Sequence, residues 1–157
     1  MPHSANNSTG SLEQRVELII QSRLDAVPLL VNLVGSLCEW AGACHADRHL
    51  LVLCLAEAAN NSIIHAYHGE PGNKVIVEVT LSPERLVFEV IDTGETADVA
   101  KMNTDRRHAI GAASLGALAE SGRGLAIMQE VMDSVEYSTE AGYNRLRLTK
   151  QVESKKS

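Results

Sequence analysis

Three stretches of the chain alternate apolar and polar residues, which is the pattern of strands with one buried face. The first spans residues 14–21. The other two are hairpins, one of residues 74–81 and 85–91 and the other of residues 135–139 and 144–151. Their connections contain Ser82-Pro83-Glu84 and Ala141-Gly142, which are residue types that favour turns. We therefore expect a lone strand and, later in the chain, two hairpins.

Apolar residues at helical spacing predict three helices. The first covers residues 25–40, with Pro28 tolerated in its first turn, and its apolar positions are Leu29, Leu30, Leu33, Val34 and Leu37. The second runs from about residue 48 to residue 67, between Asp47 and Gly69, which favour the beginning and the end of a helix. The third covers about residues 124–132.

Residues 95–121 have no clean period and are rich in Ala, Gly, Ser and charge. Such a long stretch in a compact domain is usually a functional lid or disordered, and we expect a lid. The resulting order, β-α-α-β-β-lid-α-β-β, predicts one domain over residues 13–152. Its expected fold class is α+β, a two-layer sandwich whose mixed, mostly antiparallel sheet has helices on one face. Residues 1–12 and 153–157 are expected to be a disordered leader and a frayed tail.

The formal net charge of −6 argues against a nucleic-acid partner, which would favour a basic surface. No apolar run reaches the roughly 18 residues of a membrane span, and residues 1–10 lack the apolar core of a signal peptide. We therefore expect a cytoplasmic protein without a membrane partner. Cys38, Cys44 and Cys54 show no C-x-x-C spacing and are expected to be plain buried thiols.

The second predicted helix carries polar residues on a face of its own. These residues are Glu57, Asn61, His65 and His68, whereas Leu51, Cys54, Leu55, Ala58 and Ser62 mark the side toward the core. An amide oxygen one turn from a carboxylate is useful chemistry, because the amide ligates Mg²⁺ and the carboxylate accepts a proton from a hydroxyl or water. The alternative is a solvated helix face, since glutamate is mostly exposed.

Two glycine-containing motifs are further candidates. Asp92 and Gly94 follow an apolar strand, where the carboxylate accepts a hydrogen bond from an amine such as that of adenine and the glycine lets the backbone pass close to a flat ring. Gly122, Arg123 and Gly124 open a helix, whose free N–H groups and dipole favour an anion. The alternatives are a simple turn for the first motif and a hinge for the second.

In this order and spacing, the three motifs resemble the Bergerat ATP-binding fold of the GHKL superfamily, which gyrase-type ATPases, heat-shock chaperone ATPases, histidine kinases and mismatch-repair ATPases share. The segments EAANNSIIHAYHG and GRGLAIMQEVMDSVEY are similar to bacterial anti-sigma-factor serine kinases of partner-switching systems. The resemblance covers residues 16–151. The chain departs from the pattern at Thr96, where Asp-x-Gly-x-Gly has its second glycine. It also departs at residues 142–145, Gly-Tyr-Asn-Arg, where Gly-Thr-Thr is usual and a Thr helps to hold adenine through water.

The resemblance implies a role for each residue of the first two motifs. Glu57 would be the general base, and Asn61 would ligate a Mg²⁺ ion that bridges the nucleotide phosphates. Asp92 would bind the adenine amine, with Gly94 beside the ring. His65 matches the family, where a packing or lid-supporting role is an alternative to catalysis.

The resemblance implies that the third motif would contact the phosphates. By the same resemblance, Gly122 and Gly124 would hinge the lid and present N–H groups to a phosphate. The candidates for contact with the γ-phosphate are Lys101, Arg106, Arg107 and Arg123.

The implied function is that of an ATP-dependent serine/threonine protein kinase, with ATP and Mg²⁺ in its site, that phosphorylates an anti-sigma antagonist protein. In its other state such a protein binds and sequesters a sigma factor, and the family also implies a homodimer. One alternative is a nucleotide-gated binding module without kinase activity, which would not need Glu57. Another is the catalytic domain of a histidine kinase, which would need a preceding helical hairpin with a phospho-accepting histidine.

Overall fold

The computed structural model describes residues 13–43, 45–97 and 122–152, of which residues 45–46 and 122–123 are described by their backbone alone. The predicted leader, the predicted tail, Cys44 and most of the predicted lid lie outside this part of the chain.

The strands form one open sheet. They are β1 (Gln14–Gln21), β2 (Lys74–Leu81), β3 (Arg85–Asp92), β4 (Ser134–Glu140) and β5 (Tyr143–Gln151). The sheet order is β1-β2-β3-β5-β4, and every neighbouring pair of described strands is antiparallel. The predicted hairpins are confirmed, and Ala141 and Gly142 have the positive φ values, 51° and 81°, of a tight hairpin turn. Because β3 pairs with β5, Asp92 lies opposite Asn144 although 52 positions separate them in sequence.

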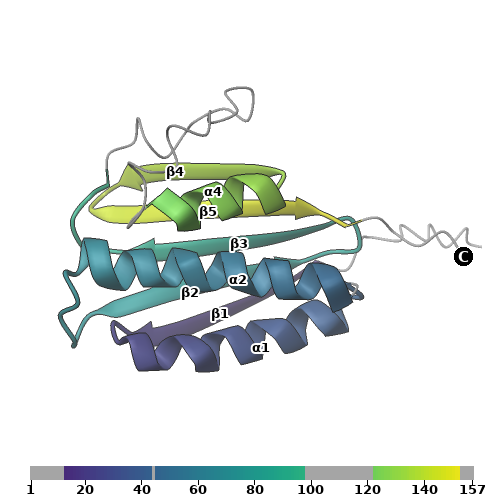
Figure 1. Cartoon of the computed structure of the whole chain (residues 1–157), viewed down its shortest axis with the longest axis horizontal. Coiled ribbons are helices and arrows are strands. Elements are labelled where there is room, and N and C mark those ends of the chain that lie inside the picture. The colour runs from purple at the N-terminus through teal and green to yellow at the C-terminus, as the bar shows by residue number, and fades with distance from the viewer. Residues whose placement is uncertain (1–12, 44, 98–121, 153–157) are drawn as a thin grey trace, which may run out of the picture.

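The described helices lie together on one face of this sheet (Figure 1). They are α1 (Val27–Trp40), α2 (His45–Asn61) and α4 (Gly122–Val131). A 3-10 turn, η1 (Leu24–Ala26), precedes α1, and a π-helical turn, η2 (Ser62–Ala66), continues α2. The predicted α+β two-layer sandwich is therefore confirmed. None of the described helices is both long and apolar enough to cross a membrane.

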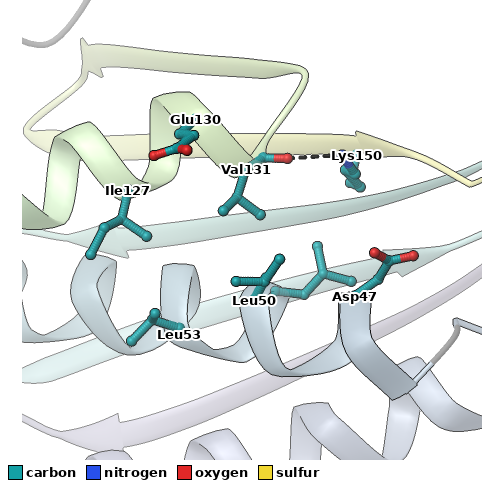
Figure 2. A pocket seen from close by; sticks show the side chains of 8 residues that line it. Asp47, Leu50, Leu53, Ile127, Glu130, Val131 and Lys150 are labelled. Atoms are coloured by element: carbon teal, nitrogen blue, oxygen red, sulfur yellow. Dashed lines mark hydrogen bonds between the residues drawn. The ribbon is translucent and has the colours of Figure 1, made fainter.

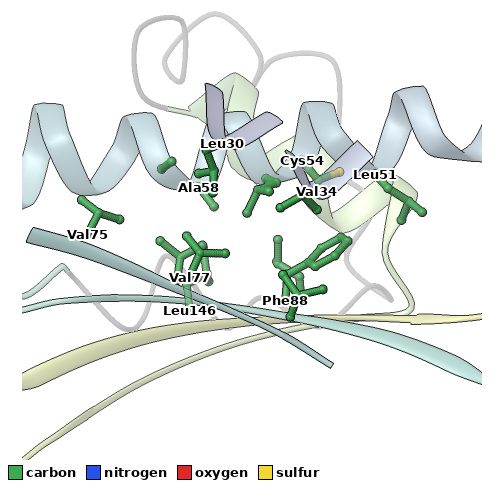
Figure 3. Close-up of a cluster of buried hydrophobic side chains, with 14 of the residues drawn as sticks. Leu30, Val34, Leu51, Cys54, Ala58, Val75, Val77, Phe88 and Leu146 are labelled. Carbon is green, nitrogen blue, oxygen red and sulfur yellow. The ribbon is translucent and has the colours of Figure 1, made fainter. Parts of the chain in front are cut away.

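The hydrophobic core fills the space between the two layers (Figure 3). From the sheet, Val77, Phe88 and Leu146 point toward the helices, and from the helices Leu30 and Ala58 point back at them. All of these side chains are buried. The alternation seen in the sequence arises because the inward positions of each strand meet the helices.

Helix α1 buries only part of its apolar surface. Leu30, Val34 and Cys38 are completely buried, whereas Leu29 and Leu33 are 59% and 45% exposed. A helix in a two-layer sandwich meets the sheet along one stripe, and these two leucines lie outside that stripe. Helical spacing alone therefore predicts the helix without identifying which leucines pack in the core.

Cys38 in α1 and Cys54 in α2 are completely buried, as predicted. Burial raises the pKa of each thiol to about 11. Both groups are therefore protonated at neutral pH and pack as small apolar side chains.

The face of the sheet away from the helices carries ion pairs. Glu78 and Glu89 lie opposite each other on β2 and β3, and Arg145 lies 2.7 Å from Glu89 and 3.7 Å from Glu78. Arg15 on β1 also pairs with Glu78. Burial acts to raise the pKa of Glu78, but its hydrogen bond and charge interactions with the arginines outweigh burial and lower that pKa. The arginines thus compensate for two like charges placed side by side.

The two kinds of leucine on α1 give a matched test of the fold. We expect Leu30→Ala to lower the free energy of unfolding by about 2–5 kcal/mol, because it leaves a cavity in the core. Leu29→Ala, measured at a protein concentration low enough for the monomer, should change it by no more than about 0.5 kcal/mol, as for most surface substitutions. Urea unfolding of both variants measures the difference, and equal effects would contradict the described orientation of α1.

Candidate functional site

The predicted base and the predicted glycine motif meet where α2 packs against α4. The half-buried Glu57 lies against the first turn of α4, since a Cβ placed on Gly124 would be 2.5 Å from Glu57 Oε2 and 3.2 Å from its Cβ. A side chain at position 124 would displace the carboxylate of Glu57, so the present arrangement of the two residues depends on the glycine. A carboxylate is thereby held beside a helix N-terminus, where backbone N–H groups lack partners within the helix.

The polar face predicted for the second helix is regular only as far as Asn61. From Ser62 the backbone follows the π-helical turn η2, in which the N–H of Tyr67 donates to the carbonyl of Ser62 at 3.0 Å. A π turn is wider than an α turn, so the spacing that places Glu57 and Asn61 on one face does not extend to His65. His65 is exposed.

Asp92, at the end of β3, is only 7% exposed and accepts hydrogen bonds at both carboxylate oxygens. The hydroxyl of Ser62 donates to Oδ2 at 2.7 Å. The N–H of Gly94 and the side-chain amide of Asn144 donate to Oδ1 at 3.0 and 2.8 Å. A buried carboxylate is costly unless donors replace its water, and here the donors come from η2, the loop after β3, and β5.

Asn144 uses both ends of its amide and is 2% exposed. Its NH₂ group also donates to the carbonyl of Gly94 at 3.0 Å. Its oxygen accepts hydrogen bonds from the hydroxyls of Thr96 and Thr139, at 3.0 and 3.2 Å. The end of β3, the residues that follow it and the β4–β5 hairpin are thus joined in one polar network, with Asp92 and Asn144 buried at its centre and Thr96 and Thr139 exposed at its edge.

Gly94 lies directly against the end of η2. A Cβ at this position would collide with the carbonyl oxygen of Ala66 and would lie 2.5 Å from the carbonyl carbon. The N–H of Glu95 donates to the same carbonyl at 2.8 Å, and the exposed side chains of Glu95 and His68 form a pair at 2.7 Å. Gly94 is therefore required by a close approach to Ala66 of the chain itself, and the contact with a flat ring stays a prediction.

A groove of about 410 Å³ lies further along the same two helices, between α2 and α4 (Figure 2). Leucine, isoleucine and valine side chains make up most of its lining, together with Asp47, Glu130 and Lys150. Lys150 donates to the carbonyl of Val131 at 2.9 Å, near the end of α4. The lining includes none of the candidate polar or glycine residues of the three motifs, so the surroundings of Glu57 and Asp92 are the better candidate for a nucleotide site.

The structure brings together some of the predicted residues and leaves others untested. Glu57 contacts Gly124, and Asp92 accepts a hydrogen bond from Gly94. Helix α4 begins at Gly122, two residues before the predicted helix. The residues that lie outside the described side chains are Lys101, Arg106, Arg107 and Arg123.

Sequence analysis did not identify Ser62, Thr96 and Asn144 as partners of the site. A signal existed for two of them. Ser62 occupies a core-facing helix position, and strand alternation places Asn144 on the same face as Leu146. A polar residue at a position expected to be buried needs a hydrogen-bond partner. Ser62 and Asn144 therefore indicated buried hydrogen bonds, but the sequence did not identify their partners.

Comparison with known proteins identifies the family. The sequence pattern of the histidine kinase-like ATPase domain matches residues 20–150. The chain belongs to this family. The fold and the motif order that a histidine kinase-like ATPase domain implies are those described above, and the resemblance stated from the motifs is confirmed.

Several named proteins are similar to this histidine kinase-like ATPase domain. The serine-protein kinase RsbW of Bacillus pumilus is 28% identical over 129 residues, which are 81% of this chain and 80% of the relative. That of Listeria monocytogenes is 28% identical over 144 residues, 87% of this chain and 88% of the relative. The anti-sigma F factor of Oceanobacillus iheyensis is 37% identical over 82 residues, 52% of this chain and 53% of the relative.

Alanine substitutions of two glycines, Gly94 and Gly35, give a matched test of the contact between the loop after β3 and η2. Gly94→Ala should lower the free energy of unfolding by about 1–3 kcal/mol, because its methyl group would overlap backbone atoms of Ala66. Gly35→Ala in α1 should be neutral or stabilising by up to about 1 kcal/mol, since its Cβ would lie 3.6 Å from Val52 and alanine favours a helix. Urea unfolding of both variants measures these effects. A Gly94→Ala variant as stable as the parent chain would contradict the close contact.

Proposed function

We propose that the chain is an ATP-dependent serine/threonine protein kinase that phosphorylates an anti-sigma antagonist protein and, in another state, binds and sequesters a sigma factor. One observation carries the kinase proposal: the carboxylate of Glu57 lies against the N-terminus of α4 at Gly124. A helix N-terminus favours a phosphate, and a carboxylate beside it is placed to receive a proton from a hydroxyl that attacks that phosphate.

In the proposed reaction, Glu57 accepts the proton of the acceptor hydroxyl. The hydroxyl oxygen bonds to the γ-phosphorus of ATP, while the bond from that phosphorus to the bridging oxygen breaks and ADP leaves. Because phosphoryl transfer depends mainly on positioning and on charge stabilisation, the chain's task is to hold these groups in line. Glu57 is suited to this task because Gly124 packs against its side chain.

We assign the rest of the nucleotide to the residues around Asp92 and the start of α4. Asp92 would accept a hydrogen bond from the 6-amino group of adenine, beside Gly94. Gly122 and Gly124 would offer N–H groups to the phosphates, with Arg123 adding charge. The buried carboxylate supports the adenine assignment, because a fixed acceptor discriminates between bases by the hydrogen bond it requires.

Asn61 fits a magnesium site. Its amide oxygen is a hard ligand of the kind Mg²⁺ prefers, and it lies one helical turn from Glu57. No three His, Cys, Asp or Glu side chains gather to bind a metal in the part of the chain that the structure describes. Asn61 would therefore share the ion with phosphate oxygens and water, as is usual for Mg²⁺. When bound, the ion would neutralise charge on the phosphates. His65 is exposed on η2, off the face that Glu57 and Asn61 share, and its place in the site stays a prediction.

The partners are proposed from the relatives, whose names include serine-protein kinase and anti-sigma F factor. A kinase that controls a sigma factor would act in the cytoplasm, where ATP and transcription are found. We also propose a homodimer, which light scattering of the whole chain tests. Support comes from large apolar side chains exposed on β1, η1 and α1, which are Ile19, Leu24, Leu29, Leu33 and Trp40.

Substitution of Glu57 should separate catalysis from binding. We expect Glu57→Gln to slow phosphate transfer by ~10²–10⁴-fold, the usual contribution of a general base, while ATP affinity changes by less than about threefold. The matched control is Glu84→Gln, which alters an exposed residue between β2 and β3. The measurement is transfer from labelled ATP to the antagonist protein, beside calorimetric titration with ATP. Near-normal transfer by Glu57→Gln would rule out Glu57 as the base, whereas a parent chain that binds ATP without transferring phosphate would favour the nucleotide-gated binding module.

Two adjacent asparagines test the magnesium assignment. Asn61→Ala should remove most of the gain in ATP affinity that Mg²⁺ provides, whereas Asn60→Ala should retain it. The two residues are one position apart, and they point about 100° apart around α2. Calorimetry with ATP, in the presence of Mg²⁺ and in the presence of a chelator, measures the gain. An equal gain in both variants would rule out Asn61 as the ligand.

A further inference from the structure

We propose that Ser62, Thr96 and Asn144 are positioning residues that fix the carboxylate of Asp92 so that one acceptor position is left for the amino group of the nucleotide base. The inference rests on the proposed function of Asp92 as the residue that binds ATP through adenine. It assigns base selectivity in this chain to three side chains around the carboxylate as well as to the carboxylate itself.

The hydrogen bonds to Asp92 leave it little freedom. A carboxylate offers about two acceptor positions on each oxygen. Oδ1 accepts from the side-chain amide of Asn144 at 2.8 Å and from the N–H of Gly94 at 3.0 Å, so both of its positions are used. Oδ2 accepts from the hydroxyl of Ser62 at 2.7 Å, which leaves one position. An ionised carboxylate is an acceptor only, so the remaining position suits an amino group and repels a keto oxygen.

The orientation of Asn144 is itself fixed from the other side. Its amide oxygen accepts from Thr96 and Thr139. If the amide were reversed, its oxygen would face the carboxylate of Asp92 and its NH₂ group would face the two hydroxyls. The hydroxyls therefore favour the arrangement in which Asn144 donates to Asp92, and Thr96 acts on Asp92 through Asn144.

Thr96 and Asn144 also stand at the two places where the chain departs from the family pattern. Their side chains are 3.0 Å apart and hydrogen-bonded, although 48 positions separate them in sequence. If Thr96 alone were changed, the buried amide oxygen of Asn144 would keep the hydroxyl of Thr139 as a donor. The two departures therefore act together, in that Thr96 helps to orient Asn144 toward Asp92.

The test compares ATP with purine riboside triphosphate, which carries hydrogen in place of the 6-amino group. The whole chain with Mg²⁺ is titrated with each nucleotide by calorimetry, and the ratio of the two affinities measures how strongly the amino group is read. We expect the parent chain to prefer ATP by roughly tenfold or more, as for a hydrogen bond to a charged group. If the network only stabilised the fold, substitutions of its members would leave this affinity ratio unchanged.

The variants are chosen to separate the members of the set. Asn144→Ala and Ser62→Ala should each lower the preference for ATP to about threefold or less, because each frees one acceptor position on the carboxylate. Thr96→Val should lower it by a smaller factor. The double variant Thr96→Val with Asn144→Ala should be no worse than Asn144→Ala alone, because Thr96 acts through Asn144. Thr96→Ser, which keeps the hydroxyl, and Thr80→Val, a matched change on β2, should keep the parent ratio.

Each outcome decides the matter. A parent chain that prefers ATP, together with Asn144→Ala and Ser62→Ala variants of unchanged preference, would overturn the positioning role and leave Asp92 as the base-binding residue. A parent chain that binds both nucleotides equally would overturn the adenine assignment of Asp92 and this inference with it. Urea unfolding of each variant identifies any that does not fold. Ser62→Ala, which removes a single oxygen, then decides the outcome in place of Asn144→Ala.

Discussion

Burial of the Asp92 charge is the constraint on which the site depends. A carboxylate taken out of water is destabilising unless donors surround it, and here no single element supplies enough of them. Ser62 donates from the helix layer, Gly94 from the loop after β3 and Asn144 from the neighbouring strand. Apolar packing elsewhere between the layers tolerates small shifts, but these directional contacts require one relative position of η2, β3 and β5.

Two glycines then determine how closely the other segments approach. Gly94 brings the loop after β3 against Ala66, and Gly124 brings the first turn of α4 against Glu57. Both contacts are made to the continuous segment formed by α2 and η2, which also carries Asn61 and Ser62. This segment is therefore the common support of the site: residues proposed to bind the base, the ion and the acceptor hydroxyl all take their positions from it.

The sequence predicted the elements more fully than the contacts. Alternation and helical spacing were sufficient for strands and helices because both are local, and the motif order was sufficient for the family. The π turn at Ser62 could not be read from spacing, since the same residues fit an α-helix equally well. The partners of Asp92 depend on the register between β3 and β5, which places Asn144 opposite it. The exposure of Leu29 likewise follows from how α1 lies on the sheet, and its own sequence does not determine that.

Chemical labelling of the two buried thiols can measure how often the helices separate from the sheet. Only thiolate reacts readily with alkylating reagents, and with a pKa of about 11 and no exposed surface, Cys38 and Cys54 present almost none at neutral pH. A reagent reaches them when α1 or α2 separates from the sheet, so the labelling rate measures the free energy of that separation. Since only α2 also carries Glu57 and Asn61, a difference between the two rates would distinguish motion of the site's support from motion of its neighbouring helix.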